Sequence, residues 1–320
     1  MSEAVSVRRG LRGNLRIRER ARRLPTTFKI GLAILVFHVF VAITGPLWAP
    51  YTYHKVGTGR PFEQATAQHL FGTDQLGRDI FSRVIYGAPT VLILSISGTA
   101  LGLVVGAPLG LLSGYLRGWF DEILMRIFDA FISIPFLILA LLVISAAGAD
   151  QSGNPLLLIG VVAFIYAPRV ARMARAVALD LVTRDFVTVA RARGESAWSI
   201  VWRELLPNAT GTLLVEFAVR AGYAPILIGS LGFLGFGARP PTPEWGLMIS
   251  ENRSAITTSP ITVIGPSIAL ASLVIGLNLF SDGLARLLGR SVQFHADLDR
   301  SRGGISGLAR RITRRAKTES

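Results

Sequence analysis

The residue types that could do chemistry in this chain are few, and their spacing does not favour catalysis. Cysteine is absent and the four histidines are scattered, which excludes disulfides, thiolate nucleophiles and His/Cys metal sites. Each of the three lysines follows a residue other than glycine, so the chain has no G-x-x-x-x-G-K-[ST] phosphate-binding loop. Neither a Ser/His/Asp set nor a carboxylate dyad can be argued. We therefore expect a protein that is not an enzyme by itself and needs no cofactor or metal.

The most regular polar pattern lies in residues 185–208, DFVTVARARGESAWSIVWRELLPN, which we call the helical bracket. A short helix is predicted over 186–193, ending at Gly194, because glycine favours the left-handed residue that follows a helix. Apolar residues of helical period follow it: Trp198, Val201, Trp202 and Leu205. Polar residues lie on the opposite face: Glu195, Ser199 and Arg203. Pro207 is expected to end this second helix. The pattern predicts two helices with an apolar edge that dock a partner.

Long apolar segments lie on both sides of the helical bracket. The 320 residues are 51% hydrophobic, with a mean hydropathy of +0.48, and several runs reach about 20 residues, enough to cross a bilayer. We predict six transmembrane helices. Five lie at about 30–48, 89–112, 127–147, 209–236 and 261–284, and the fourth in chain order begins near 156, with an apolar part that ends around 166. The second is rich in small residues, which place a helix inside a bundle. Pro135 should bend the third, and 115–125 should form a short cytoplasmic turn.

The two chain ends are basic. Residues 1–29 carry nine of the 34 Lys and Arg residues. They could be the start of a secretory signal, but the apolar segment that follows is long for a signal core and lacks a convincing cleavage site. An uncleaved first helix is the better interpretation. Residues 289–320 form a second basic tail, expected to be disordered beyond Asp299.

The distribution of positive charge predicts the orientation. With six crossings, 27 of the 34 Lys and Arg residues fall on the side of the two tails and six on the other side. Because cytoplasmic segments are richer in Lys and Arg, both termini and the helical bracket should be cytoplasmic. The net charge of +14 also raises the alternative of a membrane-anchored nucleic-acid binder. The tails lack interleaved aromatic residues and any binding fold, so we expect no nucleic-acid partner.

Glu216 and Arg220 fall within the fifth predicted helix. They are one helical turn apart with the glutamate first, which suits an ion pair. Arg220 is about 18 Å along the helix from Asn208, close to the centre of the bilayer. A charge there is costly unless it is paired or hydrated. Two interpretations stay open: a self-neutralising structural pair, or a polar lining of a solute path.

Two polar segments are predicted outside the membrane. Residues 49–86 end in HLFGTDQLGRDIFSRVIYGA, and residues 238–246 are ARPPTPEWG. The first could be an interfacial helix that places Ile80, Phe81, Val84 and Ile85 against lipid and turns Arg78 and Arg83 outward. It could equally contact a partner protein.

These motifs resemble those of permease subunits of ABC importers. The helical bracket resembles their EAA loop, with matches at Ala190, Gly194, Ile200, Leu206, Pro207 and Asn208. Thr188 stands where the family usually has glutamate. The external segments resemble those of the dipeptide, oligopeptide and nickel branch. Matching residues there include Gly72, Thr73, Asp74, Gly77, Arg78, Asp79, Ser82, Arg83, Gly87, Pro241, Pro243, Trp245 and Gly246. Residues 278–288 also look like the family's ending.

The resemblance implies an all-α polytopic membrane protein with the type I ABC importer permease fold. Its parts would be a basic tail (1–29), a first helix with an external loop (30–86), a five-helix core (87–288) and a second tail (289–320). It would be a C-type subunit in a bacterial or archaeal inner membrane. Its implied partners are a second homologous permease subunit, two ATPase subunits and an extracytoplasmic solute-binding protein.

The resemblance also implies a mechanism in which partner ATPases grip the helical bracket and rock the attached helices. The expected docking residues are Thr188, Ala190, Gly194, Trp198, Ile200, Val201, Trp202, Leu205, Leu206 and Pro207. Glu216 and Arg220 are the candidates for the translocation path. Peptide is the implied solute, although relatives carry nickel or sugars. The alternative function is a stand-alone secondary transporter or channel, for which an internal repeat or a pair of broken helices would be expected.

Overall fold

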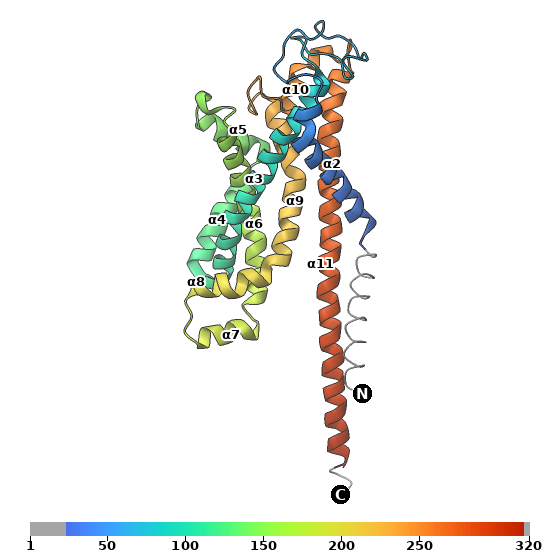
Figure 1. Ribbon diagram of the computed structural model, residues 1–320. Coiled ribbons are helices and arrows are strands. Elements are labelled where there is room, and N and C mark those ends of the chain that lie inside the picture. The colour runs from blue at the N-terminus through green and yellow to red at the C-terminus, as the bar shows by residue number, and fades with distance from the viewer. Residues whose placement is uncertain (1–23, 317–320) are drawn as a thin grey trace, which may run out of the picture.

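The described part of the chain consists of helices joined by loops (Figure 1). The computed structural model describes residues 24–316, with side chains placed for residues 24–288 apart from Ala149. Across residues 24–316, the only strand-like pairing is an isolated bridge between Thr73 and Asp79. Most of the predicted N-terminal tail, residues 1–23, lies outside the described residues. The all-α prediction is confirmed.

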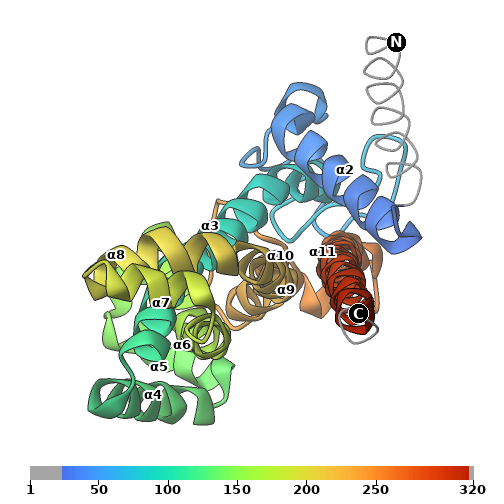
Figure 2. The same ribbon diagram turned by 90° about the horizontal axis from the view of Figure 1, so that it is seen from below.

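Five helical stretches are long and apolar enough to cross a membrane, and a bent pair of helices supplies a sixth. The five are α2 (Thr26–Trp48), α3 (Ile80–Leu116), α6 (Pro155–Leu181), α8 with α9 (Ala197–Phe233) and α11 as far as Leu288. The bent pair is α4 (Gly118–Ser133) and α5 (Phe136–Ala146). In the view from below, α2 and α11 lie on one side, α4, α5 and α6 on the other, and α9 between them (Figure 2). The predicted number of crossings is confirmed when the bent pair counts as one.

The α3–α6 contact depends on small residues. Glycines recur on one face of α3 at every fourth position: Gly98, Gly102, Gly106, Gly110 and Gly114. A Cβ atom on Gly110 would lie 2.1 Å from the carbonyl oxygen of Ala171. The two backbones therefore touch, which is the packing that small residues allow between membrane helices. The prediction that this glycine-rich helix lies inside the bundle is confirmed.

Two of the predicted helix boundaries are wrong at α3. The helix begins at Ile80 rather than at 89, because the side chain of Asp79 accepts a hydrogen bond from the backbone N–H of Ser82 and caps it. At its other end, Arg117 (φ 56°) and Gly118 (φ 66°) reverse the chain. Helix α4 then starts at once, where a longer turn over 115–125 was predicted.

The third crossing breaks at the predicted proline, and the bend is 99°. Ile134 has extended backbone angles (φ −79°, ψ 131°), as residues before proline prefer. Pro135 is also extended, with ψ 127°. The hydrogen-bonded ladder is therefore interrupted completely, and α5 leaves α4 almost at a right angle.

The prediction that Pro207 ends a helix is wrong. A single π-helical turn, Val201–Leu205, joins α8 (Ala197–Ile200) to α9 (Leu206–Phe233) without a break. The backbone N–H of Leu206 donates to the carbonyl oxygen of Val201, five residues earlier. Pro207 then occupies the first turn of α9, where its missing N–H costs no hydrogen bond. The second half of the helical bracket is thus one end of a helix long enough to cross the membrane.

The C-terminal segment also differs from the prediction. Helix α11 (Ile261–Ala316) continues through most of the residues expected to form a disordered tail. Seven of residues 289–316 are arginine, which has high helix propensity, and the helix continues through the four glycines of this segment.

Candidate functional site

The helical bracket lies at one end of the molecule, remote from the external segments (Figure 1). Its first half is α7 (Asp185–Ala192), close to the predicted 186–193. Gly194 follows in the left-handed conformation (φ 74°), as predicted. The hydroxyl of Ser196 then accepts a hydrogen bond from the N–H of Ser199 and caps α8. Local residue chemistry therefore explains both the turn and the restart of the helix.

The predicted apolar stripe divides into a buried and an exposed part. Val201 and Leu205 are buried, and they pack with the equally buried Ile200 and Ala190 in a core shared with α3 and α6. In contrast, Trp198 is 56% exposed and Trp202 is 42% exposed. Their ring centroids are 5.5 Å apart in an edge-to-face arrangement. The exposed surface of the bracket therefore carries two aromatic rings, which only contact each other. Two further exposed residues of the bracket are Thr188 and Pro207.

An ionic network stiffens the turn of the helical bracket. The carboxylate of Glu195 accepts hydrogen bonds from Arg193 Nη2 (2.7 Å) and Ser199 Oγ (3.1 Å). These two hydrogen bonds hold the pKa of Glu195 below its usual value, and the bond from Arg193 has the larger effect. Arg191 lies over the ring of Tyr115 at 4.8 Å, which ties the bracket to the end of α3. The bracket is therefore in contact with α3 and continuous with α9.

At the opposite end, the first external motif forms a buried ionic cluster. Asp74 accepts hydrogen bonds from Arg78 Nε (2.5 Å) and Arg83 Nη1 (2.6 Å). Arg83 also donates to Glu251 at 2.8 Å, at the end of α10 (Trp245–Glu251). Arg78 is 3% exposed and Arg83 is fully buried. The interpretation that turned both arginines outward is wrong, because a loop carboxylate, Asp74, and a helix carboxylate, Glu251, neutralise them inside the protein.

The second external motif is also largely buried. Trp245 is 1% exposed, and its Nε1 donates to the carbonyl oxygen of Val84, 2.9 Å away. The Glu244 carboxylate accepts from the backbone N–H groups of Gly246 and Leu247 and caps α10. Burial raises the pKa of Glu244 to about 7. Pro243 is buried, whereas Pro241 is exposed. These residues hold α10 against α3 and α9.

The remaining motif residues of the first segment share this structural character. Buried positions there are Gly72, Thr73, Gly77 and Asp79. Gly72 and Gly77 have positive φ angles of 69° and 65°, which explains the choice of glycine. Asp79 accepts from His69 Nδ1 at 2.9 Å as well as capping α3. The motif thus folds the loop onto the start of α3.

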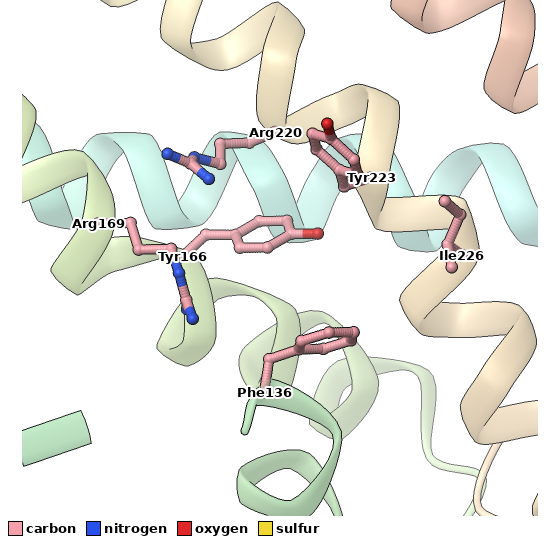
Figure 3. Close-up of a pocket in the computed structure, with 6 residues that line it drawn as sticks. All are labelled: Phe136, Tyr166, Arg169, Arg220, Tyr223 and Ile226. Atoms are coloured by element: carbon pink, nitrogen blue, oxygen red, sulfur yellow. The ribbon is translucent and has the colours of Figure 1, made fainter. Parts of the chain in front are cut away.

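Glu216 and Arg220 form the expected ion pair, with 2.6 Å between Oε1 and Nη2. Arg220 also lines a pocket of about 360 Å³ between α5, α6 and α9. The pocket is lined by Phe136, Tyr166, Arg169, Arg220, Tyr223 and Ile226. Tyr166 and Arg169 project from α6, and Arg220, Tyr223 and Ile226 come from α9 (Figure 3). Pairing and pocket lining are therefore compatible for Arg220.

The sequence analysis missed the two tyrosines, Arg169 and the polar contacts between α4 and α6. Arg169, Arg172 and Arg175 are spaced at i, i+3 and i+6 on α6, and this pattern alone shows only that they share one face of the helix. Arg172 pairs with Asp129, and Arg175 Nε bonds Asp121 at 2.5 Å. The available signal was the eight-residue spacing of Asp121 and Asp129, which places both carboxylates on one face of α4, about two turns apart.

Comparison with known proteins decides the family. The family described as binding-protein-dependent transport system inner membrane component matches residues 106–294. The chain belongs to this family. Its fold is the type I ABC importer permease fold, and it is a multi-pass inner-membrane permease component.

Named relatives cover most of the chain. A dipeptide transport system permease protein, DppC, of Alkalihalophilus pseudofirmus is 34% identical over 80% of this chain and 83% of its own. A glutathione transport system permease protein, GsiD, of Pectobacterium atrosepticum is 38% identical over 69% of this chain and 72% of its own. The Escherichia coli GsiD is 36% identical over 83% of this chain and 86% of its own.

The fold also matches a solved transporter. A chain of the inward-facing MetNI methionine ABC transporter superposes with a TM-score of 0.52 and 20% identity. The match covers 65% of this permease and 97% of that chain. At this identity the match concerns the fold alone.

Proposed function

We propose that this permease is half of the translocation path of an ATP-driven importer of di- and oligopeptides. A second, homologous permease subunit supplies the other half, two ATPase subunits supply the energy, and an extracytoplasmic binding protein delivers the solute. Family membership and relatives named for dipeptide and glutathione transport support the solute class. The chain itself has no phosphate-binding loop, so hydrolysis of ATP belongs to the partners.

One observation carries the mechanism: the helical bracket is continuous with the helix that lines the pocket. From Ala197 to Phe233 the chain is a single 37-residue helical stretch. It carries Trp198 and Trp202 at its exposed cytoplasmic end and Arg220 at the pocket. A push on the tryptophans therefore reaches Arg220 through a continuous helix, with no hinge loop in between. Movement of α9 against α6 would then change access to the pocket.

The first test concerns docking of the ATPase subunits. Trp198→Ala and Trp202→Ala should each weaken their association roughly 30-fold, because large aromatic anchors commonly contribute about 2 kcal/mol or more to an interface. Co-purification at graded ATPase concentration measures the effect. Trp119→Ala is the matched control, since Trp119 is 75% exposed but lies on α4, outside the bracket.

Transport by the reconstituted complex is the second part of this test. Uptake of a labelled dipeptide into proteoliposomes should require ATP, the ATPase subunits and the binding protein, and should fail with either bracket variant. Uptake by this chain without the ATPases would instead establish the alternative of a stand-alone transporter.

A further inference from the structure

Arg169 has a different environment from the two arginines that follow it on α6. Arg172 and Arg175 each pair with an aspartate of α4. Arg169 donates from Nη1 to the backbone oxygen of Ile165 at 2.8 Å, and no carboxylate of residues 24–288 pairs with it. A guanidinium group has five N–H donors and is always charged. Most of its donors therefore remain for water or a ligand.

The pocket around Arg169 carries a net positive charge. Arg169 and Arg220 both line it, and they lie close enough to act on each other electrostatically. Glu216 neutralises one of the two charges through its 2.6 Å pair with Arg220. One positive charge is left over. Since a charge within a membrane helix is costly unless it is paired or hydrated, this site favours an anionic ligand.

The position of this charge suits a path between the two membrane faces. Arg169 lies 14 residues after the start of α6 and 12 before its end, so it is about 21 Å and 18 Å from the two ends. Arg220 lies 14 residues into α9, which runs in the opposite direction. Both charges are therefore near the midpoint of the crossing helices.

The other lining residues match a short peptide. The hydroxyl groups of Tyr166 and Tyr223 can donate to an anion, while Phe136 and Ile226 offer apolar surface to a side chain. In the view of Figure 3, the ring of Tyr166 lies between Phe136 on α5 and Tyr223 on α9, with Ile226 beside them. The volume of about 360 Å³ is within the range of small-ligand sites.

We propose that this pocket is a transient binding station for the free carboxylate of the solute, and that Arg169 is the residue that pairs with it. The proposal rests on the proposed function and names the chemical group that the path recognises. Glu216 neutralises Arg220, so the uncompensated positive charge of the pocket is that of Arg169. The tyrosines complete a set of donors, and the peptide side chain contacts Phe136 and Ile226.

The transport test compares a dipeptide with its C-terminal amide, using the complete complex in proteoliposomes. Arg169→Gln should lower uptake of the free acid at least about tenfold, the size of a lost charged hydrogen bond, and change uptake of the amide by less than about twofold. Any preference of the binding protein itself cancels, because each variant is compared with the wild type for the same peptide. Arg169→Lys should keep part of the preference, since it keeps the charge.

Arg172→Gln is the matched control, because it removes one positive charge from the same helix outside the pocket. It should leave the acid-to-amide ratio unchanged. An equal loss of acid and amide uptake in Arg169→Gln would overturn the proposal and assign Arg169 a structural or lipid-contacting role.

A second measurement does not depend on transport. The natural chain has no cysteine, so Ile226→Cys introduces one thiol at the pocket. A negatively charged thiosulfonate reagent should react with it several-fold faster than a positively charged one, and Arg169→Gln should remove this preference while Arg172→Gln keeps it. Equal reactivity toward both reagents would overturn the proposal. If the wild-type complex imports no peptide, the proposed function fails, and this labelling still decides the charge of the pocket.

Discussion

Arg83 is fully buried, and its charge is balanced by carboxylates from two distant parts of the chain. Asp74 lies nine residues before it, and Glu251 lies 168 residues after it. With Arg78 the cluster holds two positive and two negative groups. A balanced cluster of this kind contributes less to stability than the cost of breaking it suggests, because all four ions are desolvated.

We therefore predict a large effect from unbalancing this cluster. Glu251→Gln leaves a buried positive charge without its partner and should lower the free energy of unfolding by about 3–5 kcal/mol. Thermal unfolding of the purified protein in detergent measures the change. Glu122→Gln removes one carboxylate from an exposed pair with Arg126 and should leave the thermal unfolding almost unchanged, because water screens the pair. Equal effects of the two variants would show that the external cluster is hydrated and unimportant for folding.

Helices α3 and α6 are in backbone contact along a glycine row, and this contact sets the second prediction. Gly110→Ala places a Cβ 2.1 Å from the oxygen of Ala171, so the helices must separate. We expect a loss of about 1–3 kcal/mol, typical of overpacking. Gly160→Ala on α6 is the matched control, because no atom lies within 4 Å of its added Cβ.

The two glycine variants share the same change in helix propensity and differ in the contact that the added Cβ meets, so the comparison isolates the α3–α6 contact. Alanine favours a helix over glycine in both places by about 1 kcal/mol. Gly160→Ala should therefore be neutral or stabilising in a thermal unfolding measurement. A stabilising Gly110→Ala would mean that α3 and α6 are not in contact as described.

Elements whose signal is local were predictable from the sequence. The lengths of the apolar runs predicted the crossings, and the small residues of α3 predicted its central position. The turn at Gly194 followed from the conformational freedom of glycine. The prediction that Pro207 ends a helix failed because a π-helical turn can accommodate a proline without ending the helix. The residue types of 201–205 do not indicate such a turn.

The missed features depend on residues that are far apart along the chain. Arg83 could not be assigned to the interior without knowing that Glu251 pairs with it. The ion pair of Arg172 likewise could not be predicted without knowing that Asp129 lies opposite. Periodicity places a residue on a face of its helix, but it does not show which helix lies opposite. The pocket at Arg169 was missed for the same reason, since it needs α5, α6 and α9 together.

At the scale of the whole molecule, the helical bracket and the external segments lie at opposite ends of the bundle (Figure 1). We infer that the bracket end is cytoplasmic, because that assignment puts 26 of the 34 Lys and Arg residues inside, with Arg169 and Arg220 within the membrane, and follows the usual bias of inner-membrane proteins. Both termini then lie in the cytoplasm. This orientation places the bracket next to ATP and the buried ionic cluster next to the incoming solute.

The absence of cysteine allows a direct test of this orientation. Two exposed positions suit the introduction of a single cysteine: Thr188 in the bracket and Gln75 in the external loop. A membrane-impermeant thiol reagent should label Gln75→Cys in intact spheroplasts and Thr188→Cys only in inside-out vesicles. The reverse pattern would place the bracket outside and remove the basis for ATP-driven coupling. Labelling of both from one side would mean that the number of crossings between them is even, which would contradict the path from α3 through the bent pair and α6.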